Sequence, residues 1–258
     1  MSSKIRFLRH ASFILALVGT LVVYQMFSVA ATPAVINWGL SHHGEETTPT
    51  PPAGSAELLA MHNGIFVGDT TKREVYLTFD LGYEAGYTAE VLDVLNSHNV
   101  KAIFFLCGNY LKETELVNRM IAEGHTIGNH TNHHKDLPTL SHEAMREDIA
   151  SFTQLFEENF SAKHTLKHFR PGKGRFNEAV LKEANAQGLK TVMWSNAIVD
   201  WNKTPIDPAS SSEKLIKRIH PGCIILLHIS NSGMPKMLDL LIPQLLEKGY
   251  IIGDAGTL

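Results

Sequence analysis

The chain has 258 residues, of which 44% are apolar and 19% are charged, so it can bury a sizeable core and has an ordinary globular composition. Its two cysteines cannot supply the bridges that hold a small disulfide-rich secreted fold together. The formal net charge of -3 provides no overall basic field, so we do not expect nucleic acid as a partner.

The first 31 residues predict export. Three basic residues, Lys4, Arg6 and Arg9, precede an apolar run that ends at Ala31. A basic flank followed by an uncharged run is typical of a signal peptide, and about 20 apolar residues can also span a bilayer. We therefore expect residues 1–31 to be a signal peptide or a membrane anchor. The rest of the chain then lies outside the cytoplasm and meets a membrane only through this segment.

Residues 44–56 combine three prolines with small and polar residues and show no apolar periodicity. That composition is typical of a linker or a loosely wrapped segment, so we expect residues 32–67 to be a linker and N-terminal extension. Residues 68–258 are then expected to form a single folded domain.

Beyond this segment, short β-rich apolar runs alternate with amphipathic helical stretches. The expected elements are a strand at 75–79, a helix at 88–98, a strand at 101–106, a helix at 113–123, an extended segment at 125–128, helices at 141–159 and 177–188, a strand at 190–195, a helix at 212–219, a strand at 223–227, a helix at 235–248 and an extended segment at 250–252. This alternation is typical of parallel α/β architecture. We expect one barrel-like domain, with an open doubly wound sheet as the alternative because periodicity does not report closure.

Polar side chains recur at the ends of the expected strands, where parallel α/β folds gather their functional groups. Asp80 is either a general base or a cap for the next helix, and spacing alone favours the cap. Arg170 either pairs with Asp80 or lies at the surface. His228 follows four apolar residues and is either a general acid or, more commonly, a core histidine bonded to the backbone.

His130 and His134 stand four residues apart, so in a helical turn both imidazoles would face one side and could hold a divalent metal such as Zn. A chain with 14 histidines also yields such a pair by chance. The spacing alone leaves a metal site and a solvated loop open.

Five ordered motifs resemble those of a known family. They are Thr78-Phe79-Asp80, His130-Thr-Asn-His-His134, Arg170-Pro-Gly-Lys-Gly174, Asp200-Trp201 and Leu226-Leu227-His228. In order and spacing they resemble the motifs of NodB-homology polysaccharide deacetylases, carbohydrate esterase family 4. Wider segments, such as Trp194-Ser-Asn-Ala-Ile-Val-Asp-Trp201, look like the PdaA-type subgroup, the delta-lactam-forming muramic acid de-N-acetylases of the spore cortex.

The resemblance implies a distorted (β/α) barrel that hydrolyses an N-acetyl group from a glycan sugar. Carried over by motif, Asp80 is the base that deprotonates the attacking water, and Arg170 tethers its carboxylate. His228 protonates the departing amine, and Asp200 orients and charges His228. Amide hydrolysis needs such an acid and base, together with stabilisation of a tetrahedral oxyanion.

The resemblance also implies a divalent metal, with Zn as our expectation, held by His130 and His134. The usual family pattern has a second Asp where this chain has Leu81, which cannot ligate. Members of the PdaA-type subgroup also commonly lack that Asp, so the substitution does not by itself signal an inactive protein. We expect a weakly held metal, and we expect Leu81→Asp to tighten it if residue 81 points toward the imidazoles.

The expected partner is a glycan, peptidoglycan, and within it N-acetylmuramic acid during cortex formation in sporulation. Such a site must accommodate a lactyl carboxylate, for which Lys173 and Arg175 are the candidate cations. The Lys173 N–H is also a candidate oxyanion donor, and Trp201 completes the substrate-contacting set. The alternatives are deacetylation of N-acetylglucosamine in chitooligosaccharides and a glycan-binding pseudoenzyme with an incomplete metal site. We expect a monomer.

The two cysteines are expected to be free thiols. Cys107 follows one expected strand and Cys223 begins another, so in a parallel barrel they lie near opposite rims. A disulfide needs Cα atoms within about 7 Å of each other.

Overall fold

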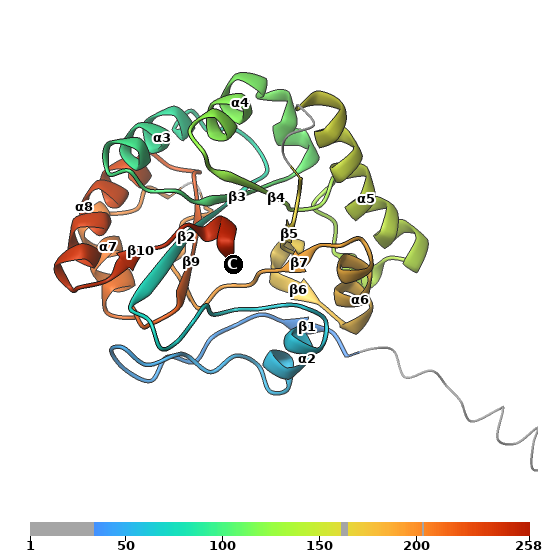
Figure 1. Ribbon diagram of the computed structural model, residues 1–258, viewed down its shortest axis with the longest axis horizontal. Coiled ribbons are helices and arrows are strands. Elements are labelled where there is room, and N and C mark those ends of the chain that lie inside the picture. The colour runs from blue at the N-terminus through green and yellow to red at the C-terminus, as the bar shows by residue number, and fades with distance from the viewer. Residues whose placement is uncertain (1–33, 161–164, 203) are drawn as a thin grey trace, which may run out of the picture. The chain divides into compact units, whose positions relative to one another are not determined.

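A curled parallel sheet forms the centre of the fold in the computed structural model (Figure 1). Its strands are, in chain order, β2 (Glu74–Leu81), β3 (Ile103–Leu106), β4 (Thr126–Asn129), β5 (His168–Phe169), β7 (Lys190–Thr191), β8 (Asn196–Ala197), β9 (Cys223–His228) and β10 (Ile251–Ile252). They lie side by side as β7-β5-β4-β3-β2-β9-β8, while β10 pairs with the start of β2. In the described part of the chain the end strands β7 and β8 do not pair with each other. The sheet is thus half of a barrel, which confirms the distorted barrel expected from sequence.

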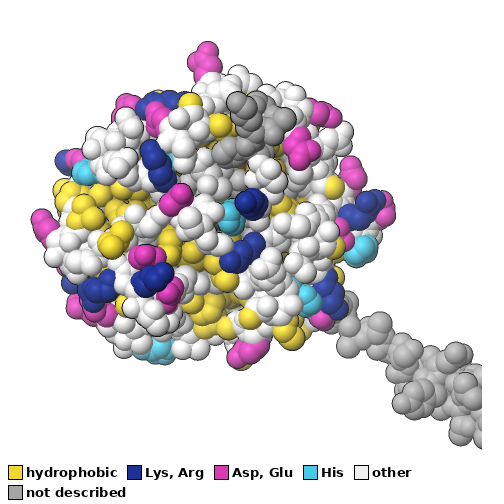
Figure 2. Space-filling model, viewed as in Figure 1, with side chains coloured by type: hydrophobic (Ala, Val, Ile, Leu, Met, Phe, Trp, Pro, Cys, Tyr) yellow, Lys and Arg dark blue, Asp and Glu magenta, His cyan; other side chains and the backbone are white. Residues whose placement is uncertain are grey.

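The structure describes residues 34–160, 165–202 and 204–258. The expected signal peptide or anchor at 1–31 lies outside these residues. Among the helices that are described, none combines the length and the apolar character needed to cross a bilayer. Acidic and basic side chains are interspersed over the face shown in Figure 2.

The neighbouring strands β2 and β9 are apolar because the sheet buries them on both faces. Val75, Leu77 and Phe79 of β2 are fully buried, as are Ile225 and Leu227 of β9. Parallel strands covered on both faces are typically runs of this kind. Asp80 and His228 are register partners at the carboxyl ends of these strands. Two polar side chains therefore meet where the apolar pairing stops.

Helices pack around the outside of the curled sheet (Figure 1). They are α3 (Thr88–Ser97), α4 (Thr114–Ala122), α5 (His142–Asn159), α6 (Glu178–Ala186), α7 (Pro208–Ile216) and α8 (Met234–Glu247). Two begin where the sequence predicts, each at a capping residue: Ser141 accepts a hydrogen bond from Ala144 N, and Asn177 accepts one from Val180 N.

Two element boundaries differ from expectation. Helix α7 begins at Pro208 rather than near 212, because Asp207 accepts a hydrogen bond from Ser210 N and proline suits a first helical position. The strand expected at 190–195 is only Lys190–Thr191 long. Beyond it, the carbonyls of Val192 and Met193 accept hydrogen bonds from the Arg170 guanidinium.

The N-terminal extension packs as part of the same unit, Val35–Leu258. β1 (Ile36–Asn37) pairs with β6 (Arg175–Phe176), and α2 (Ser55–Met61) forms within residues 32–67, which the sequence predicts to be a linker and N-terminal extension. The Trp38 main-chain N–H donates to the Gly174 carbonyl at 2.8 Å, and its ring packs on those of Phe66 and Trp194. The boundary expected at residue 68 therefore does not separate two packed units.

Both cysteines are free and buried, as expected. Burial raises the pKa of Cys223 to about 12 and raises that of Cys107 as well, so neither is a reactive thiolate at neutral pH.

Candidate active site

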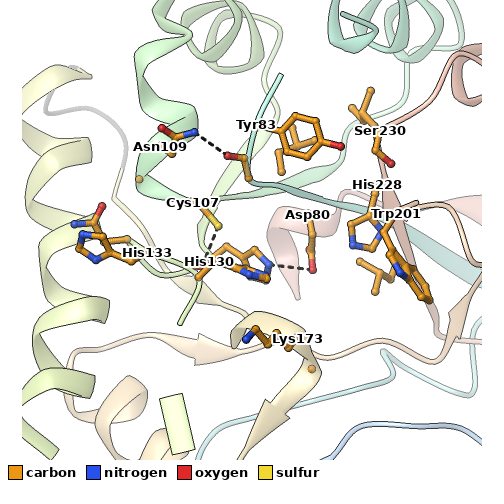
Figure 3. A pocket seen from close by; sticks show the side chains of 18 of the residues that line it. Asp80, Tyr83, Cys107, Asn109, His130, His133, Lys173, Trp201, His228 and Ser230 are labelled. Atoms are coloured by element: carbon orange, nitrogen blue, oxygen red, sulfur yellow. Dashed lines mark hydrogen bonds and ion pairs between the residues drawn. The ribbon is translucent and has the colours of Figure 1, made fainter. Parts of the chain in front are cut away.

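A cavity of about 1200 Å³ lies at the carboxyl ends of β2, β4 and β9 (Figure 3). It brings together side chains that are far apart in sequence, namely Asp80, His130, His134, Lys173, Trp201 and His228. Arg170 and Asp200 lie behind two of them, fully buried. Among the residues expected at the site, Arg175 alone is outside both groups.

Asp80 ends β2 with its carboxylate held by the buried Arg170 guanidinium. Arg170 Nη1 donates to Asp80 Oδ1 at 2.7 Å and to Thr78 Oγ1 at 2.9 Å. Burial raises the pKa of Asp80, but the charge and hydrogen bond of Arg170 together with the nearby His130 and His228 outweigh it and hold that pKa below its usual value. Asp80 is therefore an oriented carboxylate, not the cap of α3 that spacing alone favours.

Asp200 and His228 form a second buried pair. His228 Nδ1 lies 2.9 Å from Asp200 Oδ1, and the His228 main-chain N–H donates to Oδ2 at 2.8 Å. Burial lowers the pKa of His228, but the hydrogen bond and charge of Asp200 outweigh it, and that pKa is raised. The His228 ring is therefore bonded to a carboxylate, and not to the backbone as in a typical core histidine. Because Nδ1 faces Asp200, His228 offers Nε2 to the pocket.

His130 and His134 follow β4 and meet at the pocket, with ring centroids 5.0 Å apart and planes at 61°. The helical turn assumed for their spacing is wrong, since Thr131 and His134 have φ of 68° and 53°. Burial lowers the pKa of His130 to about 4 and lowers that of His134, so both rings are neutral at pH 7. Neutral imidazole is the form that binds divalent metals.

The donors around His130 fit a metal ion. His130 Nδ1 donates to the Arg170 carbonyl at 2.8 Å, which leaves the Nε2 lone pair 3.5 Å from Asp80 Oδ2. His130 Nε2 and Asp80 Oδ2 are both hydrogen-bond acceptors, and no proton lies between them. A cation bound between the two atoms would therefore be favoured. Ligands 2.0–2.2 Å from a tetrahedral ion lie about 3.4 Å apart.

The third family ligand is missing where Leu81 stands. Leu81 is 2% exposed and packs in the main apolar cluster, although it also borders the pocket. Within the described ranges, no group of three or more His, Cys, Asp or Glu side chains is arranged as a ready-made metal site. The available donors are the two imidazoles and the free oxygen of Asp80.

The three residues expected to contact substrate have different surroundings. Lys173 borders the pocket with φ of 62°, and Trp201 is 56% exposed with its ring 6.0 Å from that of His228. Arg175 instead forms an ion pair with Asp136 away from the pocket. The expectation for Arg175 is therefore corrected, because β6 directs its side chain to a carboxylate that neutralises it.

The pocket residues that escaped sequence reasoning include Trp38, Tyr83 and Lys112. Tyr83 follows Asp80 by three residues, just beyond an expected strand, so its position was a usable signal. Trp38 lies in the stretch expected to be a linker and N-terminal extension. Nothing in the local pattern around Lys112 indicates that it reaches the pocket.

Comparisons with known proteins agree with this geometry. A family described as polysaccharide deacetylase matches residues 67–192. The peptidoglycan-N-acetylmuramic acid deacetylase PdaA of Bacillus subtilis is 37% identical over 83% of this chain and 82% of its own length. A peptidoglycan-N-acetylglucosamine deacetylase of Bacillus cereus is 38% identical, over 71% of this chain and 67% of its own.

Solved structures give the same result. The structure of Bacillus subtilis PdaA, a family 4 carbohydrate esterase, has a TM-score of 0.79 and 36% identity, covering 84% of this chain and 94% of the other. A family 4 pseudoenzyme from Bacillus anthracis has a TM-score of 0.70 and 30% identity, covering 76% of this chain and 68% of the other. Because the likeness to PdaA extends over most of both chains in sequence and in fold, this chain belongs to the polysaccharide deacetylases of carbohydrate esterase family 4.

Proposed function

We propose that the protein hydrolyses the N-acetyl group of peptidoglycan sugars, and of N-acetylmuramic acid in particular. The observation that carries this proposal is the meeting of two buried pairs, Asp80 with Arg170 and His228 with Asp200, at neighbouring strand ends beside one cavity. One pair presents an ionised carboxylate and the other an imidazole whose charged form is stabilised. These are the base and the acid that amide hydrolysis needs.

The residues act in a defined order. Asp80 accepts a proton from the water that attacks the acetyl carbonyl, while Arg170 keeps the carboxylate oriented. The Lys173 N–H is the proposed donor to the oxyanion of the tetrahedral intermediate. His228 then donates the Nε2 proton to the nitrogen as the C–N bond breaks, and Asp200 stabilises the imidazolium. The products are acetate and a free amine on the sugar.

We further propose that His130 Nε2, His134 and Asp80 Oδ2 hold a divalent metal, with zinc the choice that imidazole and carboxylate ligands favour. A metal bound there would polarise the acetyl carbonyl and lower the pKa of the attacking water.

Replacing His134 with alanine is expected to weaken zinc binding by at least about 10-fold. A loss of that size follows even when a site loses only a residue that hydrogen-bonds to a metal ligand. Isothermal titration calorimetry of the full chain measures this, and His142→Ala, at an exposed histidine outside the pocket, is the matched control. Leu81→Asp is expected to tighten binding. Unchanged affinity in both His134→Ala and Leu81→Asp would contradict the proposed ligand set.

The charge of the pocket supports muramic acid as the substrate. Lys112 and Lys173 border it, and neither has an ion-pair partner among the residues that the structure describes. Asp80 is the one carboxylate among the described lining residues, and Arg170 balances it. A cavity with unpaired cations favours a sugar that carries a carboxylate, as the lactyl group of muramic acid does once its peptide is removed.

Acetate release is expected to be faster from glycan strands freed of peptide than from strands with peptide or from chitooligosaccharides. Lys173→Ala is expected to reduce that preference roughly 10-fold, because a hydrogen bond to a charged group is lost. Lys182→Ala, at an exposed lysine paired with Glu178, is the matched control. Equal or faster turnover of chitooligosaccharides would favour the N-acetylglucosamine alternative instead.

We also propose that this reaction takes place outside the cytoplasm during spore cortex formation. The export segment expected at 1–31 and the resemblance to the PdaA-type subgroup support this setting. A fusion of residues 1–40 to a reporter enzyme that works only after export would test the location, and a cytoplasmic reporter would contradict it.

A further inference from the structure

The pocket extends beyond the residues that carry the proposed chemistry. In Figure 3, Trp201 and His228 lie at one end, Asp80 and His130 in the middle, and His133 at the other end. The volume of about 1200 Å³ is larger than the ~300–1000 Å³ usual for a site that holds one small ligand. The pocket therefore has room for a sugar beside the one that is deacetylated, and His133 lines one of its ends.

His133 is held by a buried carboxylate. Its Nδ1 lies 2.5 Å from Asp148 Oδ1, and the His133 side chain is 58% exposed while that of Asp148 is 2% exposed. A carboxylate accepts, so Nδ1 carries the proton. The ring then presents Nε2, and this atom has no hydrogen-bond partner among the described residues.

The surroundings of Asp148 argue against a role in packing alone. Its Oδ2 is buried and has no hydrogen-bond partner within the described ranges. A buried carboxylate is unfavourable unless it is paired, and here the paired group is an imidazole that faces a cavity. Asp200 and His228 have the same construction, in which a buried aspartate fixes the ring that serves the pocket.

Helix α5 positions this end of the pocket through two contacts. Asp148 holds His133, and Ser151, one turn later, accepts a hydrogen bond from Asn132 Nδ2 at 3.0 Å. The Asn132 main-chain N–H also donates to the Asp148 carbonyl at 2.9 Å. The direction of the His133 ring is therefore set before any ligand binds, which reduces the ordering that binding requires.

We propose that His133, oriented by Asp148, forms a hydrogen bond through Nε2 with a hydroxyl of the sugar next to the one that is deacetylated. This end of the pocket is thus a subsite for a neighbouring pyranose of a glycan strand, and the assignment rests on the proposed function. His133 contacts substrate in this account, whereas Asp148 is a positioning residue.

The test uses the full chain and a peptide-free peptidoglycan hexasaccharide. His133→Phe keeps a ring but removes the nitrogen that forms the hydrogen bond, and it is expected to raise KM about 3- to 10-fold, the range for one hydrogen bond, while kcat stays within about 2-fold. Asp148→Asn is expected to act in the same direction, because it removes the carboxylate that orients the His133 ring. Since both act through one contact, the double variant should be no worse than His133→Phe. His142→Phe, at another carboxylate-paired histidine, is the matched control.

A KM for His133→Phe that equals that of the wild type, or a loss confined to kcat, would overturn the subsite. The exposed position of His133 keeps the test valid even if Asp148→Asn fails to fold. Calorimetric binding of the hexasaccharide to Asp80→Asn, with and without His133→Phe, measures the same contact without turnover. A wild-type protein that binds the hexasaccharide without releasing acetate would contradict the proposed function, whereas equal binding with and without His133→Phe would contradict the subsite.

Discussion

Asp80→Asn is expected to reduce acetate release by at least about 100-fold, the lower end of the effect of removing a general base. An amide has the shape of the carboxylate but cannot accept the proton of the attacking water. The fold is expected to persist because Arg170 keeps hydrogen bonds to Thr78, Val192 and Met193. The loss of its charged partner is expected to lower the free energy of unfolding by roughly 1–3 kcal/mol.

The measurement compares initial rates of acetate release, with circular dichroism to verify the fold. Asp93→Asn is the matched control, since Asp93 is 69% exposed and pairs with Arg119 on the outer surface. A folded Asp80→Asn protein with activity within a few fold of wild type would remove Asp80 as the base.

His228→Ala is expected to have an effect of similar size, because the departing amine then lacks its proton donor. Asp200→Asn leaves the imidazole in place and is expected to change the pH dependence instead. The Asp200 carboxylate outweighs burial and raises the pKa of His228, so the acid form persists to higher pH. Without that charge the pKa falls, and the alkaline limb of the pH–rate profile moves to lower pH.

The pH–rate profile of acetate release measures both variants. His98→Ala is the matched control, because His98 also pairs with a carboxylate, that of Asp239, but lies outside the pocket. An alkaline limb that stays in place in Asp200→Asn would show that Asp200 does not set the charge of His228.

The chemistry of the site could be anticipated because the motifs lie at strand ends. An apolar run such as Ile224–Leu227 predicts a strand, and a polar residue directly after it must emerge at the edge of the sheet. Sequence could not show that β2 and β9 are neighbours, which places Asp80 and His228 in register. That pairing joins residues far apart along the chain, and local periodicity carries no information about it.

Other features depend on contacts that a local pattern cannot report. The prolines around residue 50 indicate a linker, yet Trp38 and Leu59 anchor the extension through packing with distant residues. Arg175 follows the Arg170 motif closely, and only the fold shows that Asp136 pairs with it. His130 and His134 meet through positive φ angles, which their spacing does not predict.

The similarity to a Bacillus anthracis pseudoenzyme, together with Leu81, keeps a glycan-binding protein without activity as the competing account. Two buried pairs, Arg170 with Asp80 and Asp200 with His228, argue against that competing account. A buried Arg170 and a buried Asp200 are unfavourable unless each is paired, and each here orients a group that faces the pocket. A site without chemistry has no need for either arrangement.

Acetate and free amine, measured together as the full chain acts on peptide-free peptidoglycan strands with zinc present, test the deacetylase account most directly. The account predicts equal molar amounts of the two products from the wild type and no detectable release from a folded protein that combines Asp80→Asn with His228→Ala. Release of neither product by the wild type, from these strands or from chitooligosaccharides, would contradict it.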